Sequence, residues 1–517
     1  MDNEKQNNFR DYTLADYEKD IKDKGLETTW DYILKEVMQE PNKNEVFAVN
    51  NFGSIYEYGL ACINKTSKKE LGKYYTPHDV AIVMASWLKD LSGQNICDVC
   101  CGTGNLIIAY LDLIGRDKAS GLLKESKVYL YDIDALALKI CKYSIGILYG
   151  SAYINSINTV CCDFLSKEIK LPEKSKVISN PPYFKIQSYE NGWELTENLT
   201  KSKEFYSAIM EKILRQSVSS VIITPYSFMG GEKFYNLRRE MNNHNGFIVS
   251  FDNVPGNIFN GKKHGIFNSN TSNSVRAAIT VTIDNKKTGY RISPLIRFKN
   301  EERGRILNSS LLEKYVGKKR QIVTEKSTSY KKCFPCLEDA LQKWEEKSEK
   351  TLSDYISEKP TEYVLCIPNS CRYYTVASCK DLQRTGKYIL YFNNSKDRDL
   401  IYCFLNSSFN YWHWRIFDGG ITYSIGLLER LPIFIDKLDN VTEGKLIQKA
   451  HELKVIESEY LVYKKNANQL QENIKFPDRH RNEINTLFLE ALGIESCDLS
   501  IIHNNFFFTK EEGKNNG

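Results

Sequence analysis

The stretch Ile178-Ser179-Asn180-Pro181-Pro182-Tyr183-Phe184 joins an apolar run to a rigid polar turn and two aromatic side chains. Val177 and Ile178 indicate the end of a buried strand. The two prolines fix φ at about −65° and favour an extended conformation in the residue before them. Asn180 is therefore held stiffly at a strand end, where its side-chain oxygen and nearby carbonyls can accept from a planar amino group. Tyr183 offers a face for a flat ring, although the tetrapeptide alone is also typical of an ordinary Pro-Pro turn.

Upstream of this turn, short apolar runs alternate with helical patterns. This alternation predicts an open, parallel α/β sheet. Its expected strands are 96–99, 128–131, 159–162 and 177–179, with helices over 106–113 and 135–148 between them. Three further strands are expected over 221–224, 247–251 and 277–283, and the irregular loop at 252–273 is too long for a simple connector.

Polar residues follow each of the first four strands. Cys100-Cys101-Gly102-Thr103-Gly104-Asn105 forms a glycine loop before a helix, as in a nucleotide-binding crevice, but no third glycine completes the dinucleotide pattern, which disfavours NAD. Asp132 is placed to accept from ribose hydroxyls and Asp163 from an adenine amino group. A single such acid is more often a helix cap. All four positions, however, fall at the carboxyl ends of strands, where open α/β sheets bind their ligands.

The remaining regions are less informative. Residues 1–70 have helical patterns, and Thr76-Pro77 begins a helix with an apolar face. Aromatic residues interleave with arginines in 361–435, which suits either nucleic-acid binding or a β-rich core. Residues 442–476 predict a charged helix or helical hairpin.

The composition is that of a globular protein, with 42% hydrophobic and 26% charged residues in a 517-residue chain. No apolar run reaches the ~18 residues of a membrane span, and the first residues lack a signal-peptide pattern, so a cytoplasmic location without a membrane partner is expected. The net charge of +5 permits a polyanionic partner. Cys333 and Cys336 have metal-ligand spacing, but no second pair completes a zinc site, and no metal is expected.

Together, these motifs resemble the gamma class of DNA adenine amino-methyltransferases, which includes the modification subunits of type I and type IIG restriction systems. The resemblance covers about residues 70–285 and keeps the family's motif order. The matching pieces are 73–77, 98–104, 131–134, 163–164, 180–183 and 251–259. Cys100-Cys101 departs from the pattern, because small residues such as Pro and Ala are usual there.

The resemblance implies a Rossmann-like methyltransferase domain that uses S-adenosylmethionine, followed by a mixed α+β target-recognition domain. It divides the chain into an N-terminal helical segment (1–70), a catalytic domain (71–289), a target-recognition domain (290–440) and a helical support with a tail (441–517). The implied catalytic residues are Asn180, Pro181, Pro182 and Tyr183, with Tyr183 and Phe259 against the target base. The implied cofactor contacts are Tyr74, Thr76, Pro77, Asp98, Cys100, Gly102, Gly104, Asn105, Asp132, Ile133, Asp163, Phe164 and Asn180.

The implied reaction is methylation of the N6 amine of an adenine flipped out of duplex DNA. A cytosine-N4 methyltransferase would use the same chemistry, but Asn rather than Ser at position 180 favours adenine. RNA or protein-glutamine methyltransferases also carry Asn-Pro-Pro-Tyr, and a non-catalytic DNA-binding specificity subunit is a further alternative. No Asp…Glu-x-Lys nuclease pattern is evident, so modification without cleavage is expected, with a separate restriction endonuclease or specificity subunit as a partner. The recognition sequence and the oligomeric state cannot be read from the chain.

Overall fold

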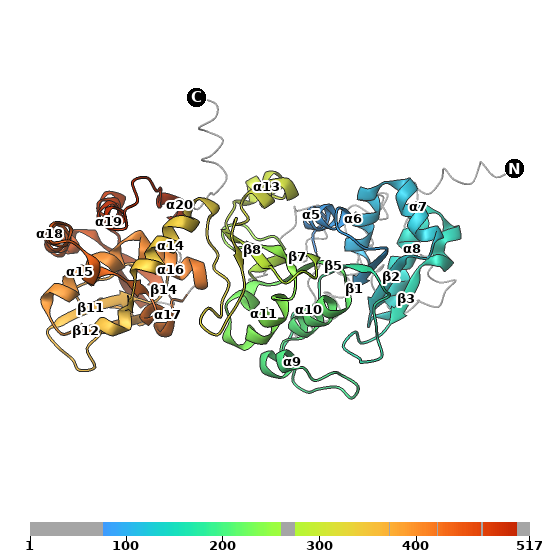
Figure 1. The fold of residues 1–517 in the computed structure, drawn as a ribbon, viewed down its shortest axis with the longest axis horizontal. Coiled ribbons are helices and arrows are strands. Elements are labelled where there is room, and N and C mark those ends of the chain that lie inside the picture. The colour runs from blue at the N-terminus through green and yellow to red at the C-terminus, as the bar shows by residue number, and fades with distance from the viewer. Residues whose placement is uncertain (1–75, 260–274, 372, 421, 467–468, 504–517) are drawn as a thin grey trace, which may run out of the picture. The chain divides into compact units, whose positions relative to one another are not determined.

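The computed structural model describes residues 76–259, 275–371, 373–420, 422–466 and 469–503 (Figure 1). The chain divides into two compact units, unit 1 up to Tyr330 and unit 2 from Lys331. The expected helices of residues 1–70 lie outside the described residues. Within the described part of the chain, no helix combines the length and apolar character that crossing a bilayer requires.

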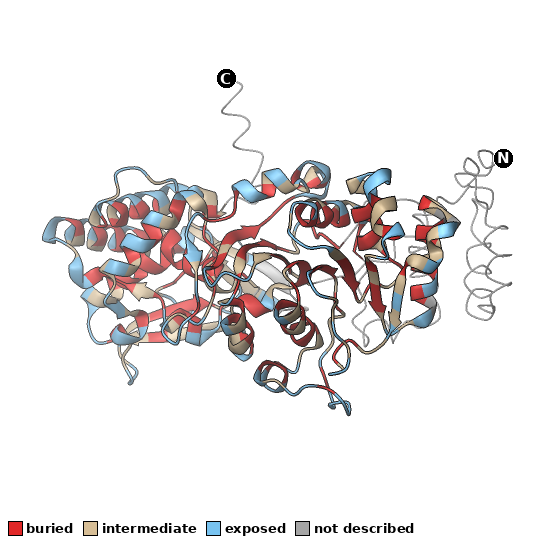
Figure 2. Ribbon diagram, turned by 45° about the vertical axis from the view of Figure 1, so that its right-hand side comes forward, coloured by how far each residue is buried: buried red, intermediate tan, exposed pale blue. Residues whose placement is uncertain are grey.

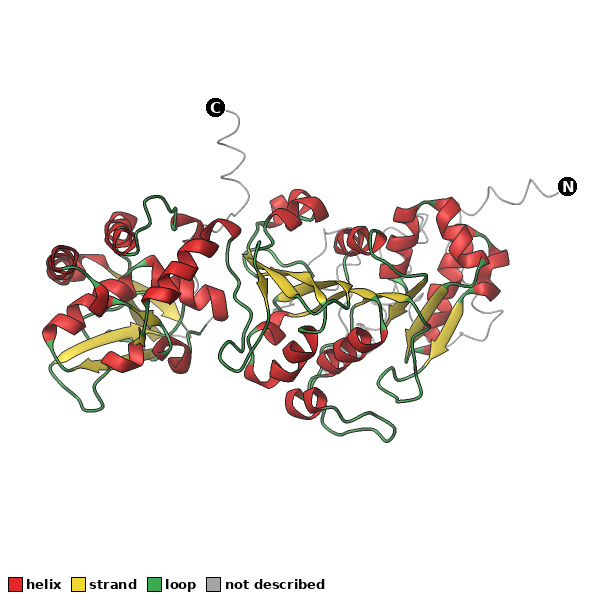
Figure 3. Ribbon diagram, in the orientation of Figure 1, coloured by secondary structure: helices red, strands yellow, loops and turns green. Residues whose placement is uncertain are grey.

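Unit 1 is built on one mixed sheet with helices on both faces (Figure 3). In spatial order, the strands found among the described residues are β3 Asn158–Cys161, β2 Val128–Asp132, β1 Asn95–Val99, β4 Ser175–Ser179, β5 Ser219–Pro225, β7 Ala277–Asp284, β6 Asn245–Phe251, β8 Gly289–Ile296 and β9 Arg320–Gln321. The helices are α5 His78–Lys89, α6 Asn105–Ile114, α7 Arg116–Lys124, α8 Ala135–Tyr149, α9 Glu197–Ser202, α10 Phe205–Gln216, α11 Tyr235–Met241, α12 Arg303–Ile306 and α13 Ser309–Lys314. Helices α5 and α6 lie on one face of the sheet and α10 and α11 on the other.

The order of the strands reverses between β1 and β4. Strands β3, β2, β1, β4 and β5 are parallel neighbours, and the chain moves outward from β1 to β3 before it returns to β4 beside β1. Every residue of β4 is buried, and the central strands of the sheet form the buried centre of the unit (Figure 2). Ligands of open α/β sheets bind at such a reversal, outside the carboxyl ends of the strands.

The predicted strands of this sheet are confirmed to within two residues at each end. The expected end of the catalytic domain at residue 289 differs from the observed end of unit 1, because β8 pairs with β6 and β9 pairs with β8. Strand β8 was not predicted because Pro294 interrupts its apolar pattern. The pairing of β8 with β6 shifts register near that proline. The apolar face predicted for the helix after Pro77 comprised Val80, Ile82, Val83, Met84, Trp87 and Leu88. All of these are buried except Ile82, which is 40% exposed.

Unit 2 packs helices around small antiparallel strand pairs. Its helices are α14 Glu338–Lys347, α15 Ser395–Asn406, α16 Ser408–Phe417, α17 Ile425–Glu429, α18 Asn440–Ile456, α19 Asp478–Ala491 and α20 Ser500–His503. Its pairs are β10 Lys350–Thr351 with β13 Pro432–Ile433, β11 Tyr363–Pro368 with β12 Lys387–Phe392, and β14 Leu461–Asn466 with β15 Gln469–Ile474. The chain after α18 therefore forms a β-hairpin, whereas a helical hairpin was one of the two expectations for 442–476.

The aromatic residues of 361–435 form a core, and this core is mainly helical rather than β-rich. Trp412 and Trp414 on α16 are fully buried, and Phe409 packs edge-on against Trp344 with ring centroids 4.9 Å apart. Leu446, Ala450 and Leu453 of α18 belong to the same core. No structural division therefore falls at the expected boundary between residues 440 and 441.

A buried histidine in this core is expected to make unit 2 less stable in acid. Burial lowers the pKa of His413 to about 3, although the ring contacts the Leu427 carbonyl at 3.1 Å. The unfolded chain therefore binds a proton below the ordinary pKa of 6.5 that the folded chain does not, so stability present above pH 6.5 is lost as the pH falls towards 3. We expect the free energy of unfolding of unit 2 to fall by up to ~1.4 kcal/mol per pH unit in this range from His413 alone.

Urea unfolding of the full chain at pH 7 and pH 5, followed by tryptophan fluorescence, measures this slope. His413→Gln keeps a polar group near the Leu427 carbonyl but cannot titrate. Unfolding of this variant should therefore take up about one proton fewer, and its free energy of unfolding should fall less steeply with pH. Identical slopes in the two proteins would show that His413 does not titrate on unfolding.

Candidate active site

The predicted catalytic turn lies at the carboxyl end of β4, beside the end of β1. Asp98 pairs in register with Ile178 and Val99 with Ser179, so Asn180 follows the sheet next to the glycine loop. The Ser179 hydroxyl donates to the Val99 carbonyl at 2.6 Å and ties the two strand ends together. The strand ends that the sequence predicted therefore meet at one edge of the sheet.

The Asn180 side chain is held by Thr76 from another segment and by Tyr183 of its own turn. Its Nδ2 donates to the Thr76 hydroxyl at 2.8 Å, and its Oδ1 accepts from the Tyr183 hydroxyl at 2.6 Å. Asn105 donates through Nδ2 to the Thr76 carbonyl. These contacts orient the amide, and they bring Thr76 and Asn105, predicted from separate motifs, to the same point. Tyr74 lies outside the described residues.

The glycine loop is shaped by left-handed backbone at three positions. The φ angles are 58° at Cys100, 53° at Gly102 and 90° at Gly104. The Gly102 N–H donates to Asp132 Oδ2 at 2.8 Å, while Asp132 Oδ1 accepts from the Asp134 N–H at 2.9 Å. Asp132 therefore links the end of β2 to the loop after β1.

Gly104 has no space for a side chain. A Cβ there would lie 2.2 Å from the Cys141 Sγ on α8. We expect Gly104→Ala to distort the loop through both this clash and its left-handed φ, and to weaken cofactor binding by about tenfold or more. Calorimetric titration with S-adenosylhomocysteine measures the loss. Adding Cys141→Ala removes the clash but leaves the backbone strain, so partial rescue is expected; no rescue would exclude the clash as a cause.

Asp98 presents a buried oxygen without a partner. Its Oδ2 accepts from the Ile107 N–H at 3.1 Å, whereas its Oδ1 has no hydrogen-bond partner among the described residues. Burial raises the pKa of this carboxyl well above its usual value. A buried acid with one unsatisfied oxygen at the end of β1 fits a cationic amino group, which would satisfy that oxygen and favour the charged form.

Asp163 and the residues around it lie at the end of β3. Asp163 Oδ1 accepts from the Leu165 N–H at 3.0 Å and Oδ2 from the Trp193 indole at 2.6 Å. Ile133 is 68% exposed and free to cover a flat ring, but Phe164 is only 3% exposed and packs edge-on against Tyr131. Of these two implied cofactor contacts, Ile133 is therefore accessible and Phe164 is covered.

The Tyr183 ring lies among other aromatic rings. Its centroid is 6.0 Å from Phe259 and 6.1 Å from Tyr206, both in edge-on geometry. Phe259 is fully buried, so it supports Tyr183 rather than presenting its own face. The expected proximity of the 252–259 loop to the catalytic turn is therefore present for its described residues.

The Phe259 loop is anchored by a buried arginine. Arg303 donates to the Asn257 carbonyl at 2.8 Å and to the Ile258 carbonyl at 2.6 Å. The same guanidinium pairs with both oxygens of Asp79 on α5, at 2.6 and 2.9 Å. Arg303 thus fixes the backbone that carries Phe259 to the helix that begins after Thr76.

Residues 48–308, just over half of the chain, match the sequence pattern of the N-6 DNA Methylase family. The chain belongs to this family. The match covers the glycine loop, the acids after β2 and β3 and the Asn180 turn. The cofactor that membership implies is S-adenosylmethionine, and the unsatisfied oxygen of Asp98 fits its amino group.

Individual relatives match over part of their length. The type II methyltransferase M.VspI of Vibrio sp. (strain 343) is 32% identical over 192 residues, 36% of this chain and 43% of that protein. The type II methyltransferase M.PstI of Providencia stuartii is 27% identical over 207 residues, 36% of this chain and 39% of that protein. The chain therefore aligns with less than half of the length of each of these two curated relatives.

Among solved structures, the methyltransferase subunit of a type I restriction-modification system from Streptococcus thermophilus aligns with a TM-score of 0.33 and 14% identity. That alignment covers 50% of this chain and 54% of that one.

Several residues of the candidate site were missed from the sequence. Trp193 and Tyr206 contact predicted site residues, and Arg303 contacts the backbone just before Phe259. None of the three belongs to a motif used in the prediction. A tryptophan in the polar segment after the catalytic turn is the one signal that could have singled out Trp193. Nothing in the sequence around Arg303 marks it among the neighbouring charged residues.

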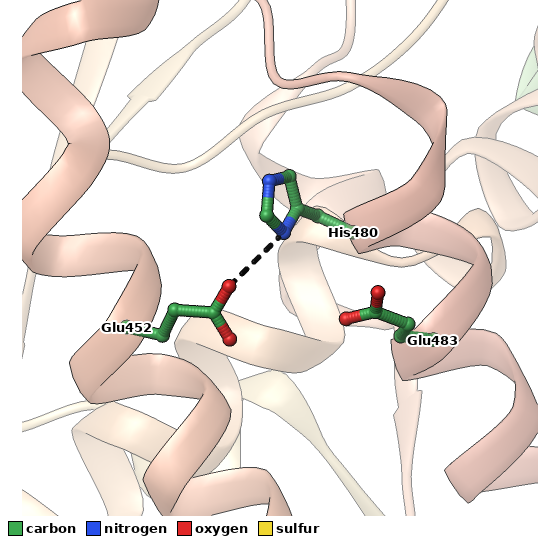
Figure 4. Close-up of side chains that lie close together, drawn as sticks. All are labelled: Glu452, His480 and Glu483. Carbon is green, nitrogen blue, oxygen red and sulfur yellow. Dashed lines mark ion pairs between the residues drawn. The ribbon is translucent and has the colours of Figure 1, made fainter.

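A second polar cluster lies in unit 2. Glu452, His480 and Glu483 place ligand atoms within 4.8 Å of one another (Figure 4). The Lys449 ammonium, however, donates to Glu452 at 2.9 Å, contacts His480 Nδ1 at 3.0 Å and bonds to Glu483. The carboxylates therefore already balance an internal cation, and the group does not include Cys333 or Cys336.

Proposed function

We propose that this protein transfers a methyl group from S-adenosylmethionine to the N6 amine of adenine in duplex DNA. The observation that carries the proposal is the Asn180 amide, fixed at the carboxyl end of β4 where the strand order reverses. Membership of the N-6 DNA Methylase family supports the same reaction. DNA as substrate implies action in the cytoplasm.

The residues at this edge of the sheet offer a set of cofactor contacts. S-adenosylmethionine, when bound, supplies an electrophilic methyl group. Asp98 Oδ1 is the acceptor for its amino group, Asp132 for the ribose hydroxyls and Asp163 for the adenine amine. Thr76, Pro77 and the loop from Cys100 to Asn105 surround the methionine moiety, and Tyr74 is proposed beside them from its motif alone. Ile133 is proposed to cover one face of the adenine ring, and Phe164, which is 3% exposed, is kept as a second contact from its motif alone.

Asn180 acts on the target amine as an acceptor. An exocyclic aromatic amine is a poor nucleophile because its lone pair is delocalised into the ring. Acceptance by Asn180 Oδ1 and the Pro181 carbonyl favours a pyramidal, more nucleophilic nitrogen, and Pro182 keeps the turn rigid. The Tyr183 hydroxyl lies 2.6 Å from Asn180 Oδ1 and 3.2 Å from the Ile223 carbonyl. We infer that its proton turns towards Ile223 when the target amine arrives, while the Tyr183 ring stacks on the base.

Unit 2 is proposed to recognise the target sequence, and a separate restriction endonuclease or specificity subunit is the proposed protein partner. Relatives in this family are named as type II methyltransferases and as type I methylase subunits, so both arrangements have precedent. We infer that direct readout of base edges comes from unit 2, because unit 1 holds the methylase motifs.

Labelled methyl transfer tests the reaction. The full chain is incubated with methyl-labelled S-adenosylmethionine and unmodified duplex DNA, and the DNA is digested to nucleosides. We expect label in N6-methyladenine. Label in N4-methylcytosine would favour the cytosine alternative, and label in RNA or protein added in parallel, with none in DNA, would overturn the proposal.

A further inference from the structure

The segment that follows the catalytic turn folds back onto the end of β3. Trp193 forms an isolated bridge with Ser166, and the Lys167 N–H donates to the Gly192 carbonyl at 2.9 Å. This return places the Trp193 indole N–H 2.6 Å from Asp163 Oδ2. A residue downstream of the Asn180 turn therefore contacts an acid proposed to bind the cofactor.

The Asp163 carboxylate has one protein donor on each oxygen. The Leu165 N–H binds Oδ1 and the Trp193 indole binds Oδ2. These two bonds fix the rotation of the carboxylate and leave each oxygen able to accept once more. The turn itself is held by Lys212, whose ammonium donates to the Phe164 and Ser166 carbonyls at 2.6 and 2.7 Å.

We propose that Trp193 is a positioning residue for recognition of the cofactor's adenine ring. By fixing the Asp163 carboxylate, it aims an acceptor at the 6-amino group, and so determines specificity for adenine over a 6-oxo purine. A 6-oxo group is itself a hydrogen-bond acceptor and cannot donate to the carboxylate. Binding of a 6-oxo purine therefore does not depend on this alignment of Asp163. The inference rests on the proposed function, because it takes S-adenosylmethionine as the ligand of this site.

Packing alone does not account for the indole N–H. Trp193 is 8% exposed and lies 6.0 Å from Phe205 in tilted geometry, contacts that a phenylalanine can largely retain. Trp87 on α5 provides a matched control: it is 5% exposed, and its indole donates to the Glu313 carboxylate at 2.7 Å. It has no recorded contact with Asp163 or its turn, so Trp87→Phe loses the same type of hydrogen bond elsewhere in unit 1.

The test compares two ligands on the full chain by calorimetric titration. S-adenosylhomocysteine carries the adenine, and S-inosylhomocysteine carries a 6-oxo ring in its place. We expect Trp193→Phe to lower the affinity for S-adenosylhomocysteine by about tenfold. The affinity for S-inosylhomocysteine should stay nearly unchanged, because only S-adenosylhomocysteine donates to an aligned Asp163. Trp87→Phe should keep the wild-type ratio of the two affinities.

Three results would overturn the inference: equal weakening of both ligands by Trp193→Phe, an unchanged ratio, or a wild-type protein that binds the two ligands equally. Equal weakening would assign Trp193 a purely structural role. Failure of the proposed function is a separate outcome, in which the wild type prefers S-adenosylhomocysteine yet methylates no DNA.

Discussion

Asn180→Ala is expected to lower the rate of methyl transfer to DNA by about 10²–10³-fold, the loss typical of removing one preorganised group at a reacting centre. The variant removes the oxygen that accepts from the target amine, and the Pro181 carbonyl alone remains. Single-turnover transfer of labelled methyl, with cofactor saturating, measures the chemical step without product release.

Cofactor binding should survive this change. The Asn180 side chain bonds to Thr76 and Tyr183, whereas the unsatisfied oxygen of Asp98 and the Asp132 carboxylate are unchanged in the variant. The Thr76 hydroxyl loses one donor, so a change in affinity of no more than a few-fold is expected. Equal loss of cofactor affinity and transfer would assign Asn180 a structural role.

Asn158→Ala is a matched control for the loss of an asparagine side chain. Asn158 begins β3, and its Nδ2 donates to the Ser126 and Val128 carbonyls at 2.7 and 3.1 Å. These bonds lie at the amino end of the strands, opposite the Asn180 turn. A loss of transfer as large as that of Asn180→Ala would show that the effect comes from general destabilisation.

The sequence located the strand ends because they combine two independent signals. Buried parallel strands are continuous apolar runs, and each of these runs stops at a polar residue. The topology then makes the polar residues neighbours, so Asp132 and Gly102, 30 positions apart, are bonded although neither indicates the other. The position of Asp132 at a strand end indicated a ribose contact, and the family resemblance assigned Gly102 to the cofactor site.

Contacts between residues that lie far apart in the sequence and belong to no motif could not be predicted. Arg303 and Asp79 are 224 positions apart, and each looks like a surface charge in its own segment. The run Tyr411-Trp412-His413-Trp414 misled for a different reason. A helix buried on all sides has no amphipathic period, so its aromatic residues resembled an exposed binding surface or a strand.

Arg303→Lys is expected to reduce methylation of fully paired DNA by about a hundredfold while lowering stability by only ~1–3 kcal/mol. A lysine ammonium cannot reach both Asp79 oxygens and the two loop carbonyls at once, because it lacks the planar fork of the guanidinium. At least one buried carbonyl then lacks a donor, and the backbone that carries Phe259 loosens behind the Tyr183 ring.

Arg303→Lys should impair capture of the flipped base rather than the methyl-transfer step itself. A target adenine opposite an abasic site costs less to flip, so it should recover most of the lost rate in Arg303→Lys, whereas Asn180→Ala should show no such recovery. Arg305→Lys, at an exposed position on the same helix, controls for the change of side chain. If paired and unpaired targets lose the same rate in Arg303→Lys, the loop that Arg303 anchors has no part in holding the base, and Tyr183 must keep its position without Phe259.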